Sequence, residues 1–311
     1  MATSDPGSRL SLPSEDPEAW SHIVSVLSRG VERLTDLDAM MSEFASLDRE
    51  PRRCTFFADI PGSAEAGRFD FELFLAKGAP LLIEVALEMP HLFADVSVPI
   101  HKTNAAWPAD GGAALHRRST TLTRRQCACL LAHSVLGSLK RPADVQPNDF
   151  RFTAVELFIG TARSPNSATT LLNYFSWLGR HGFAEGDLTF ERQGYAKAGA
   201  AAPWAWEASD APLCAVHVCD GALEESAADV HAEFANAFVG GGVMTGDFAM
   251  EEILFLVKPE LMVAMAVQVR RVSERARARP HPSQQACRRP ARRSRPPPPR
   301  MDRRTEWRTR R

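Results

Sequence analysis

The sequence predicts an α/β protein whose first half is helical and whose second half alternates helices with strands. Apolar residues recur at three- and four-residue steps over residues 19–49, 79–93 and 120–139, which is the period of an amphipathic helix. Further along, a helical pattern at 168–181 is followed by a strand-like alternation at 187–192. Because helices then alternate with strands, we expect a layered fold with a mixed sheet between helices.

The rest of the second half adds shorter elements. Residues 213–219 are apolar and predict a second strand, and residues 229–234 predict a third. Residues 251–257 predict a short helix that ends before Pro259, because the residue preceding a proline disfavours helical dihedrals. The run 260–267 fits either a buried strand or a helix.

Composition divides the chain into four segments. We expect a disordered N-terminus (1–18), a helical accessory domain (19–165), an α/β domain (166–266) and a disordered basic tail (267–311). The tail holds sixteen Arg, no Lys and three acidic residues, so the rest of the chain is acidic. Such a tail could bind polyanions without specificity, or it could be translated GC-rich non-coding sequence.

Composition also excludes several classes of protein. The six cysteines form no Cys-x-x-Cys pair and no histidine cluster accompanies them, so we predict no metal, no cofactor and no disulfide framework. The longest apolar run, 80–93, is interrupted by Glu84 and Glu88, which argues against a membrane span. With no signal pattern at the start, we expect an intracellular protein of the nucleus and/or cytoplasm. Nucleic-acid binding is expected only non-specifically through the tail.

Residues 236–252 carry the clearest chemical signal. Three consecutive glycines, Gly240 to Gly242, let backbone amides approach an anion and allow positive φ. Two adjacent carboxylates, Glu251 and Glu252, follow and open an apolar run. A phosphate cradle followed by an acid pair suits a phosphorylated sugar whose glycosidic bond is cut.

The same stretch resembles the signature of the poly(ADP-ribose) glycohydrolase family, in which a triple glycine is followed at this distance by Gln-Glu-Glu. Met250 stands at the Gln position. The resemblance covers about residues 75–265, including the Thr123-Arg-Arg-Gln helix and the run from Val216 to Glu225. It implies a macrodomain packed against a helical accessory domain. Because the family pattern gives way to the tail after Met265, we expect a partial macrodomain.

The resemblance also implies roles for individual residues. Glu252 matches the catalytic glutamate, and Glu251 matches the glutamate that binds ribose beside it. The substrate-binding positions are Leu223 and Glu224 for adenine, Glu233 and Asn236 for the sugar next to the scissile bond, Gly240, Gly241 and Gly242 for the diphosphate, and Met250. Glu233 replaces an Asp of the family and keeps its charge.

The implied reaction is hydrolysis of ribose–ribose O-glycosidic bonds in poly(ADP-ribose), releasing ADP-ribose. Its substrates would be the free polymer or poly(ADP-ribosyl)ated proteins, in the DNA damage response. Glu252 would protonate the leaving oxygen and later activate water. A catalytically inactive macrodomain remnant that binds ADP-ribose stays open as an alternative: Met250 favours it, and the intact acid pair favours the enzyme.

Overall fold

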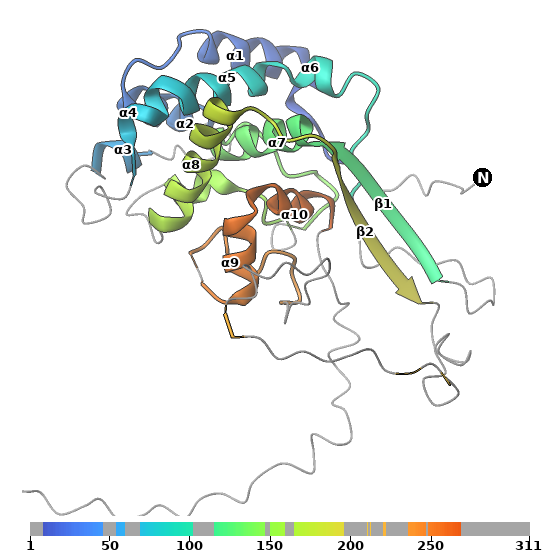
Figure 1. Cartoon of the computed structure of the whole chain (residues 1–311). Coiled ribbons are helices and arrows are strands. Elements are labelled where there is room, and N and C mark those ends of the chain that lie inside the picture. Colours follow the sequence, from blue (N-terminus) through green and yellow to red (C-terminus); the bar gives the residue numbers. More distant parts are fainter. Residues whose placement is uncertain are drawn as a thin grey trace, which may run out of the picture. The chain divides into compact units, whose positions relative to one another are not determined.

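A computed structural model describes residues 9–45, 54–59, 69–101, 115–146, 150–158, 165–195, 210, 212, 220–221, 236–246 and 248–268. All of them belong to one structural unit, Met1–Ser273. Within these residues helices dominate and one pair of strands is present (Figure 1). The strands expected at 213–219 and 229–234 lie outside the described residues, as does the tail beyond its first two residues, 267–268.

The chain begins with the short 3₁₀ helix η1 (Pro13–Glu15) and the helices α1 (Pro17–Leu27), α2 (Leu34–Ala45) and α3 (Phe56–Asp59). The side chain of Asp16 accepts from the amides of Glu18 and Ala19, both at 3.1 Å, and so caps α1. The helical region expected at 19–49 is therefore two helices. Its start also lies earlier than expected, because Pro17 supplies the fixed φ that suits a first helical position.

Residues 9–12 differ from the disorder expected through residue 18. The amide of Leu10 donates to the carbonyl of Val98 at 2.8 Å. Leu10 and Leu12 are buried. Two buried leucines and a backbone bridge fix this segment, although its composition is rich in Ser, Pro and acidic residues.

The next elements are α4 (Phe71–Leu73), the π turn η4 (Phe74–Gly78), α5 (Ala79–Leu87) and α6 (Met89–Leu92). The apolar helix expected at 79–93 is confirmed as α5 and α6. Phenylalanines form the core beside these helices: the rings of Phe56 and Phe158 meet edge to face at 5.0 Å, and Phe57 stacks on Phe74 at 6.1 Å.

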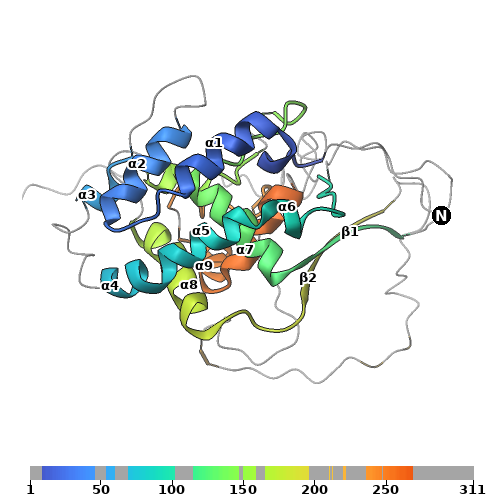
Figure 2. The same cartoon turned by 90° about the horizontal axis from the view of Figure 1, so that it is seen from above.

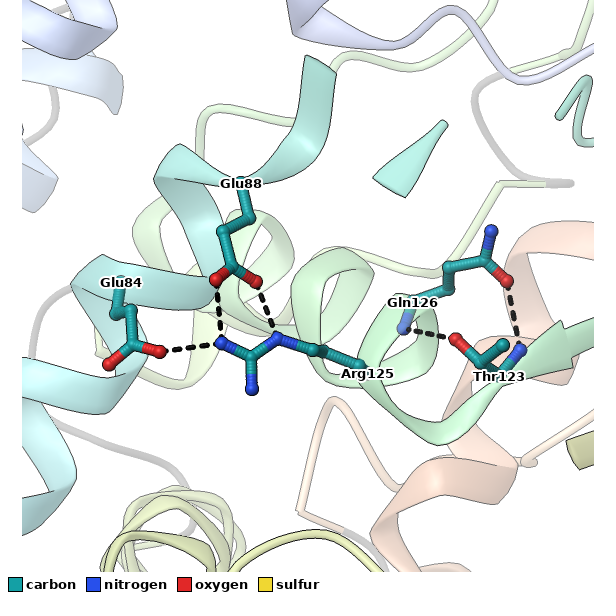
Figure 3. A network of polar contacts seen from close by, with 5 residues as sticks. All are labelled: Glu84, Glu88, Thr123, Arg125 and Gln126. Carbon is teal, nitrogen blue, oxygen red and sulfur yellow. Dashed lines mark hydrogen bonds and ion pairs between the residues drawn. The ribbon is translucent and has the colours of Figure 1, made fainter. Parts of the chain in front are cut away.

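Strand β1 (Leu115–Thr123) leads directly into α7 (Arg124–Leu136). Thr123 Oγ accepts from the Gln126 amide at 3.1 Å, and Gln126 Oε1 accepts from the Thr123 amide at 2.8 Å (Figure 3). This capping box, expected from the sequence, is confirmed. Residues 120–123, expected within the helix, are strand instead because they pair with the strand β2 (Asp187–Tyr195).

Helix α7 is the centre of the helical part. Every residue from Gln126 to Leu136 is buried. It contacts α5, α2 and α6, as the two views of the chain show (Figures 1 and 2). On its outer edge, Arg125 holds Glu88 through two hydrogen bonds of 2.5 and 2.6 Å and Glu84 through one of 2.5 Å (Figure 3).

After the 3₁₀ helix η6 (Ala154–Phe158), the chain forms α8 (Pro165–His181) and β2 (Asp187–Tyr195), as expected from the sequence. β1 and β2 pair antiparallel, with Thr123 opposite Asp187 and Leu115 opposite Tyr195. The remaining helices are α9 (Met250–Val257), η9 (Pro259–Val263) and α10 (Ala264–Val267). The run 260–267, for which strand and helix were both open, is therefore helical.

Polar contacts attach this last segment to the helical part. Arg124 of α7 forms an ion pair with Glu260, and the Tyr174 hydroxyl of α8 donates to the same carboxylate at 3.2 Å. The amide of His101 donates to the carbonyl of Val267 at 2.7 Å. Helices α7 and α8 thereby fix the segment that follows α9.

Candidate functional site

Helix α9 places two adjacent carboxylates in its first turn. Ala249 occupies the N-cap position, with extended backbone, and Glu251 and Glu252 are the second and third helical residues. Both side chains are buried, with relative exposures of 3% and 5%. Buried carboxylates are costly unless their oxygens accept hydrogen bonds, so their partners decide whether this arrangement is stable.

Glu251 is held by two backbone amides from the preceding loop. Its Oε2 accepts from the amide of Asn236 at 2.7 Å, and its Oε1 accepts from the amide of Gly240 at 2.7 Å. The carboxylate thus bridges the two ends of the segment 236–240.

Glu252 is held in a similar way by a different pair of amides. Its Oε1 accepts from Gly242 at 2.8 Å, and its Oε2 accepts from Ala249 at 3.0 Å. The contact to Ala249 is the backward half of a capping box, in which the third helical residue reaches the N-cap amide. Backbone donors therefore reach all four oxygens of the pair, and the helix N-terminus adds favourable dipoles.

The glycine loop is shaped to approach these carboxylates. Gly240 and Gly241 have positive φ values of +77° and +52°. A Cβ atom at Gly241 would lie 2.0 Å from Glu252 Oε1, and one at Gly240 would lie 2.6 Å from the sulfur of Met265. Glycine is therefore required at Gly241 both for the backbone conformation and for the space that Glu252 fills.

Turn hydrogen bonds close the loop. The amide of Gly241 donates to the carbonyl of Phe238 at 3.2 Å, and that of Thr245 donates to the carbonyl of Gly242 at 2.8 Å. The amides of Gly240, Gly241 and Gly242 therefore all donate to acceptors of the protein itself: Glu251, the Phe238 carbonyl and Glu252, respectively. The sequence-based expectation that these glycines wrap a diphosphate stays a prediction.

Other predicted site residues are placed in part. The backbone of Asn236 contacts Glu251, and its side-chain oxygen accepts from the Phe238 amide at 3.3 Å. Met250 is half-buried at the first helical position. Leu223, Glu224 and Glu233 lie outside the described residues.

One residue at this site had no signal in the sequence. The guanidinium of Arg151 lies over the ring of Phe238, 3.9 Å from its centroid, and its Nη1 donates to the carbonyl of Gly241 at 3.5 Å. Arg151 precedes the glycine loop by about ninety residues, so no local spacing connects them.

A separate groove of about 690 Å³ lies between α8 and the segment that ends α9 and begins η9. Tyr174, Trp177, Val257 and Glu260 are among its lining residues, whereas the two glutamates are not. We place the candidate site at the glutamate pair, because the groove brings together no pair of acidic groups.

Among the described residues, no cluster of three or more His, Cys, Asp or Glu side chains could hold a metal ion. Nor do those residues include a helix long and apolar enough to cross a bilayer.

The titratable groups with the clearest shifts lie away from this pair. Full burial lowers the pKa of His133 in α7 to about 4, although a hydrogen bond to the Ala86 carbonyl opposes the shift. Burial raises the pKa of Cys127 in the same helix to about 12, so this thiol is inert. Neither group is positioned for chemistry at α9.

Comparison with known families defines the class of protein to which this fold and site belong. Residues 69–192 match the family model described as the helical domain of poly(ADP-ribose) glycohydrolase, and residues 204–273 match the model described as its macrodomain fold. The two matched stretches together make up well over half of the chain. The fold is thus a helical domain followed by a macrodomain, the architecture of a class of glycosidases.

The chain belongs to the poly(ADP-ribose) glycohydrolase family. It is also similar to poly(ADP-ribose) glycohydrolase 1 of Arabidopsis thaliana, with 39% identity over 62 residues. That stretch is 19% of this chain and 11% of the plant protein. The glutamate pair and the glycine loop lie within the macrodomain match, and Arg151 lies within the helical-domain match.

Proposed function

We propose that the chain hydrolyses the ribose–ribose O-glycosidic bonds of poly(ADP-ribose) and releases ADP-ribose. The observation that carries the proposal is the pair of buried, adjacent carboxylates, Glu251 and Glu252, which accept hydrogen bonds from four backbone amides: two from the glycine loop and those of Asn236 and Ala249. This pair lies in the part of the chain that matches the macrodomain of poly(ADP-ribose) glycohydrolase.

In the proposed reaction, Glu252 serves first as an acid and then as a base. Its protonated carboxyl donates to the leaving 2′-oxygen while the bond from that oxygen to the anomeric carbon breaks. The resulting carboxylate stabilises the oxocarbenium-like sugar and then takes a proton from the water that attacks the anomeric carbon. The water thus supplies OH to one sugar and, through Glu252, H to the other.

Glu251 has a different proposed task, which is to bind ribose. The amides of Asn236 and Gly240 fix the position of its carboxylate. A carboxylate anchored in this way accepts hydrogen bonds from sugar hydroxyls without paying much rotamer entropy on binding. We therefore expect Glu251 substitutions to weaken ADP-ribose binding as well as turnover.

The alternative proposal is a module that binds ADP-ribose without cutting the polymer. Met250 favours it, because an apolar thioether stands where the family signature has an amide. Calorimetry with ADP-ribose, combined with a turnover assay, separates the two proposals. Binding without release of ADP-ribose would select the module.

The decisive variant for the hydrolase is Glu252→Gln, with Glu72→Gln, at an exposed position of α4, as its matched control. Acid–base catalysis supplies about 10²–10⁴-fold, so we expect at least a hundredfold loss of ADP-ribose release from the polymer. In Glu252→Gln the side-chain NH₂ faces a backbone N–H, so one hydrogen bond is lost and the variant can be less stable. Thermal melting of the variant is therefore measured in parallel. Equal turnover by Glu252→Gln and wild type would reject the role of Glu252.

A further inference from the structure

Arg151 reaches the glycine loop from the helical part of the chain. Its guanidinium stacks on Phe238 at 3.9 Å and donates to the Gly241 carbonyl at 3.5 Å. The loop between these two contacts is short, and the Gly241 amide donates back to the Phe238 carbonyl at 3.2 Å. One side chain therefore touches both ends of the turn.

The backbone on either side of Arg151 is fixed by packing and hydrogen bonds. Phe150 and Phe152 on either side are buried, at 4% and 0% exposure. The carbonyl of Phe152 accepts from the Ser134 hydroxyl of α7 at 3.3 Å, and the same hydroxyl accepts from the Ala154 amide at 2.8 Å. The position of the guanidinium is thus tied to the central helix.

The turn that Arg151 touches is the one that holds the glutamates. Gly240 and Gly242, the neighbours of Gly241, donate their amides to Glu251 and Glu252. A shift of the Gly241 peptide would move both donors, since the three residues are consecutive. The contact chain therefore runs from α7 through Arg151 and the turn to the two carboxylates.

We propose that Arg151 is a positioning residue for the glutamate pair. It fixes the glycine turn in the conformation that aims Glu251 and Glu252 at the sugar, and it thereby makes the helical part of the chain necessary for catalysis. This inference rests on the proposed hydrolase function. It extends that function, because it assigns a role to a residue outside the macrodomain match.

The shape of the guanidinium matters here more than its charge. A planar guanidinium can stack on a ring and donate from its edge at the same time, whereas a lysine ammonium is a compact point charge. A residue that binds the substrate diphosphate by charge would tolerate Lys. A residue that fixes the turn by stacking and donation would not.

The test uses the full chain with Arg151→Lys, Arg151→Gln and Phe238→Leu. Arg180→Gln, at the exposed end of α8, is the matched control. We expect both Arg151 variants to lower kcat for ADP-ribose release by about tenfold or more, since small misplacements at a site cost up to about 10²-fold. KM should stay within about twofold, and the double variant Arg151→Lys with Phe238→Leu should be no worse than Arg151→Lys alone.

Hydrogen exchange gives a second readout that does not depend on turnover. We expect the amides of residues 238–245 to exchange at least tenfold faster in Arg151→Gln, while those of α7 keep their wild-type protection. If wild type releases no ADP-ribose, the proposed function fails, and exchange alone then decides the structural part of the inference. Unchanged exchange in 238–245 would overturn it.

Two kinetic outcomes would also overturn the inference. An unchanged kcat in both Arg151 variants would show that the turn does not need this side chain. A raised KM with normal kcat in Arg151→Gln, restored by Arg151→Lys, would show that the charge binds substrate directly.

Discussion

Replacing Gly241 by alanine tests the geometry of the glutamate pair directly. The added Cβ would lie 2.0 Å from Oε1 and 2.9 Å from Cδ of Glu252. Both distances are far below van der Waals contact, so Glu252 must leave its position. At φ +52°, alanine also carries a left-handed penalty of about 1–2 kcal/mol.

The displacement of Glu252 adds to that penalty. Moving its carboxylate breaks the bonds from Gly242 and Ala249, and hydrogen bonds to charged groups contribute about 1.5–3 kcal/mol each. Solvent or new partners recover part of this loss. We therefore expect Gly241→Ala to lower the free energy of unfolding by about 3–5 kcal/mol and to reduce ADP-ribose release at least as strongly as Glu252→Gln.

Gly182→Ala is the matched control. Gly182 has φ +75°, but a Cβ there meets nothing within 4 Å, so only the left-handed penalty applies. Urea unfolding of both variants gives the two free energies, and anion-exchange chromatography of reaction products gives turnover. Equal destabilisation of the two variants, with normal turnover in Gly241→Ala, would refute the placement of Glu252 against Gly241.

Three further predictions concern the helical part. His133 is neutral in the folded chain, where its pKa is about 4, whereas its pKa is about 6.5 in the unfolded chain. The free energy of unfolding therefore falls as pH drops from 6.5 towards 4, because only the unfolded chain takes up a proton on this ring in that range. The loss should reach about 3 kcal/mol, and His133→Gln should flatten this part of the curve of unfolding free energy against pH. Thr123→Ala removes the acceptor for the Gln126 amide and should cost about 1 kcal/mol in urea unfolding. Arg125→Lys loses the paired contact to Glu88 and should cost up to about 1 kcal/mol at low salt, less at high salt, by thermal melting.

Each of these predictions has a contrary result. A pH profile of His133→Gln that matches wild type between pH 6.5 and 4 would contradict the neutral, buried state of His133. Full stability in Thr123→Ala would mean that the capping box contributes nothing to α7. A salt-independent loss in Arg125→Lys would indicate lost packing and not a lost ion pair.

Local sequence signals predicted the helices well. The Thr123 and Gln126 pair marked the start of α7 because a capping box involves only neighbouring residues. The period of apolar residues likewise predicted α8, and Pro259 predicted where α9 ends. β1 was missed, since its strand conformation depends on pairing with β2, which lies more than sixty residues further along the chain.

At the candidate site, the glycine loop and the acid pair could be picked out from the sequence, but their hydrogen bonds could not. The spacing of the glycines and the acid pair identified Gly240 to Gly242 and the two glutamates. Sequence could not show that the glycine amides point towards these carboxylates, because amide direction depends on the φ values of the turn. The role of Arg151 could not be predicted for a different reason, since its contact with Phe238 joins segments that are distant in the sequence.

ADP-ribose release from purified poly(ADP-ribose) by wild type, Glu252→Gln and Glu72→Gln decides whether Glu252 is the catalytic acid. We expect turnover by wild type and Glu72→Gln, and a rate at least about a hundredfold lower for Glu252→Gln. Release by Glu252→Gln at the wild-type rate, from a preparation free of other glycosidases, would contradict this role of Glu252.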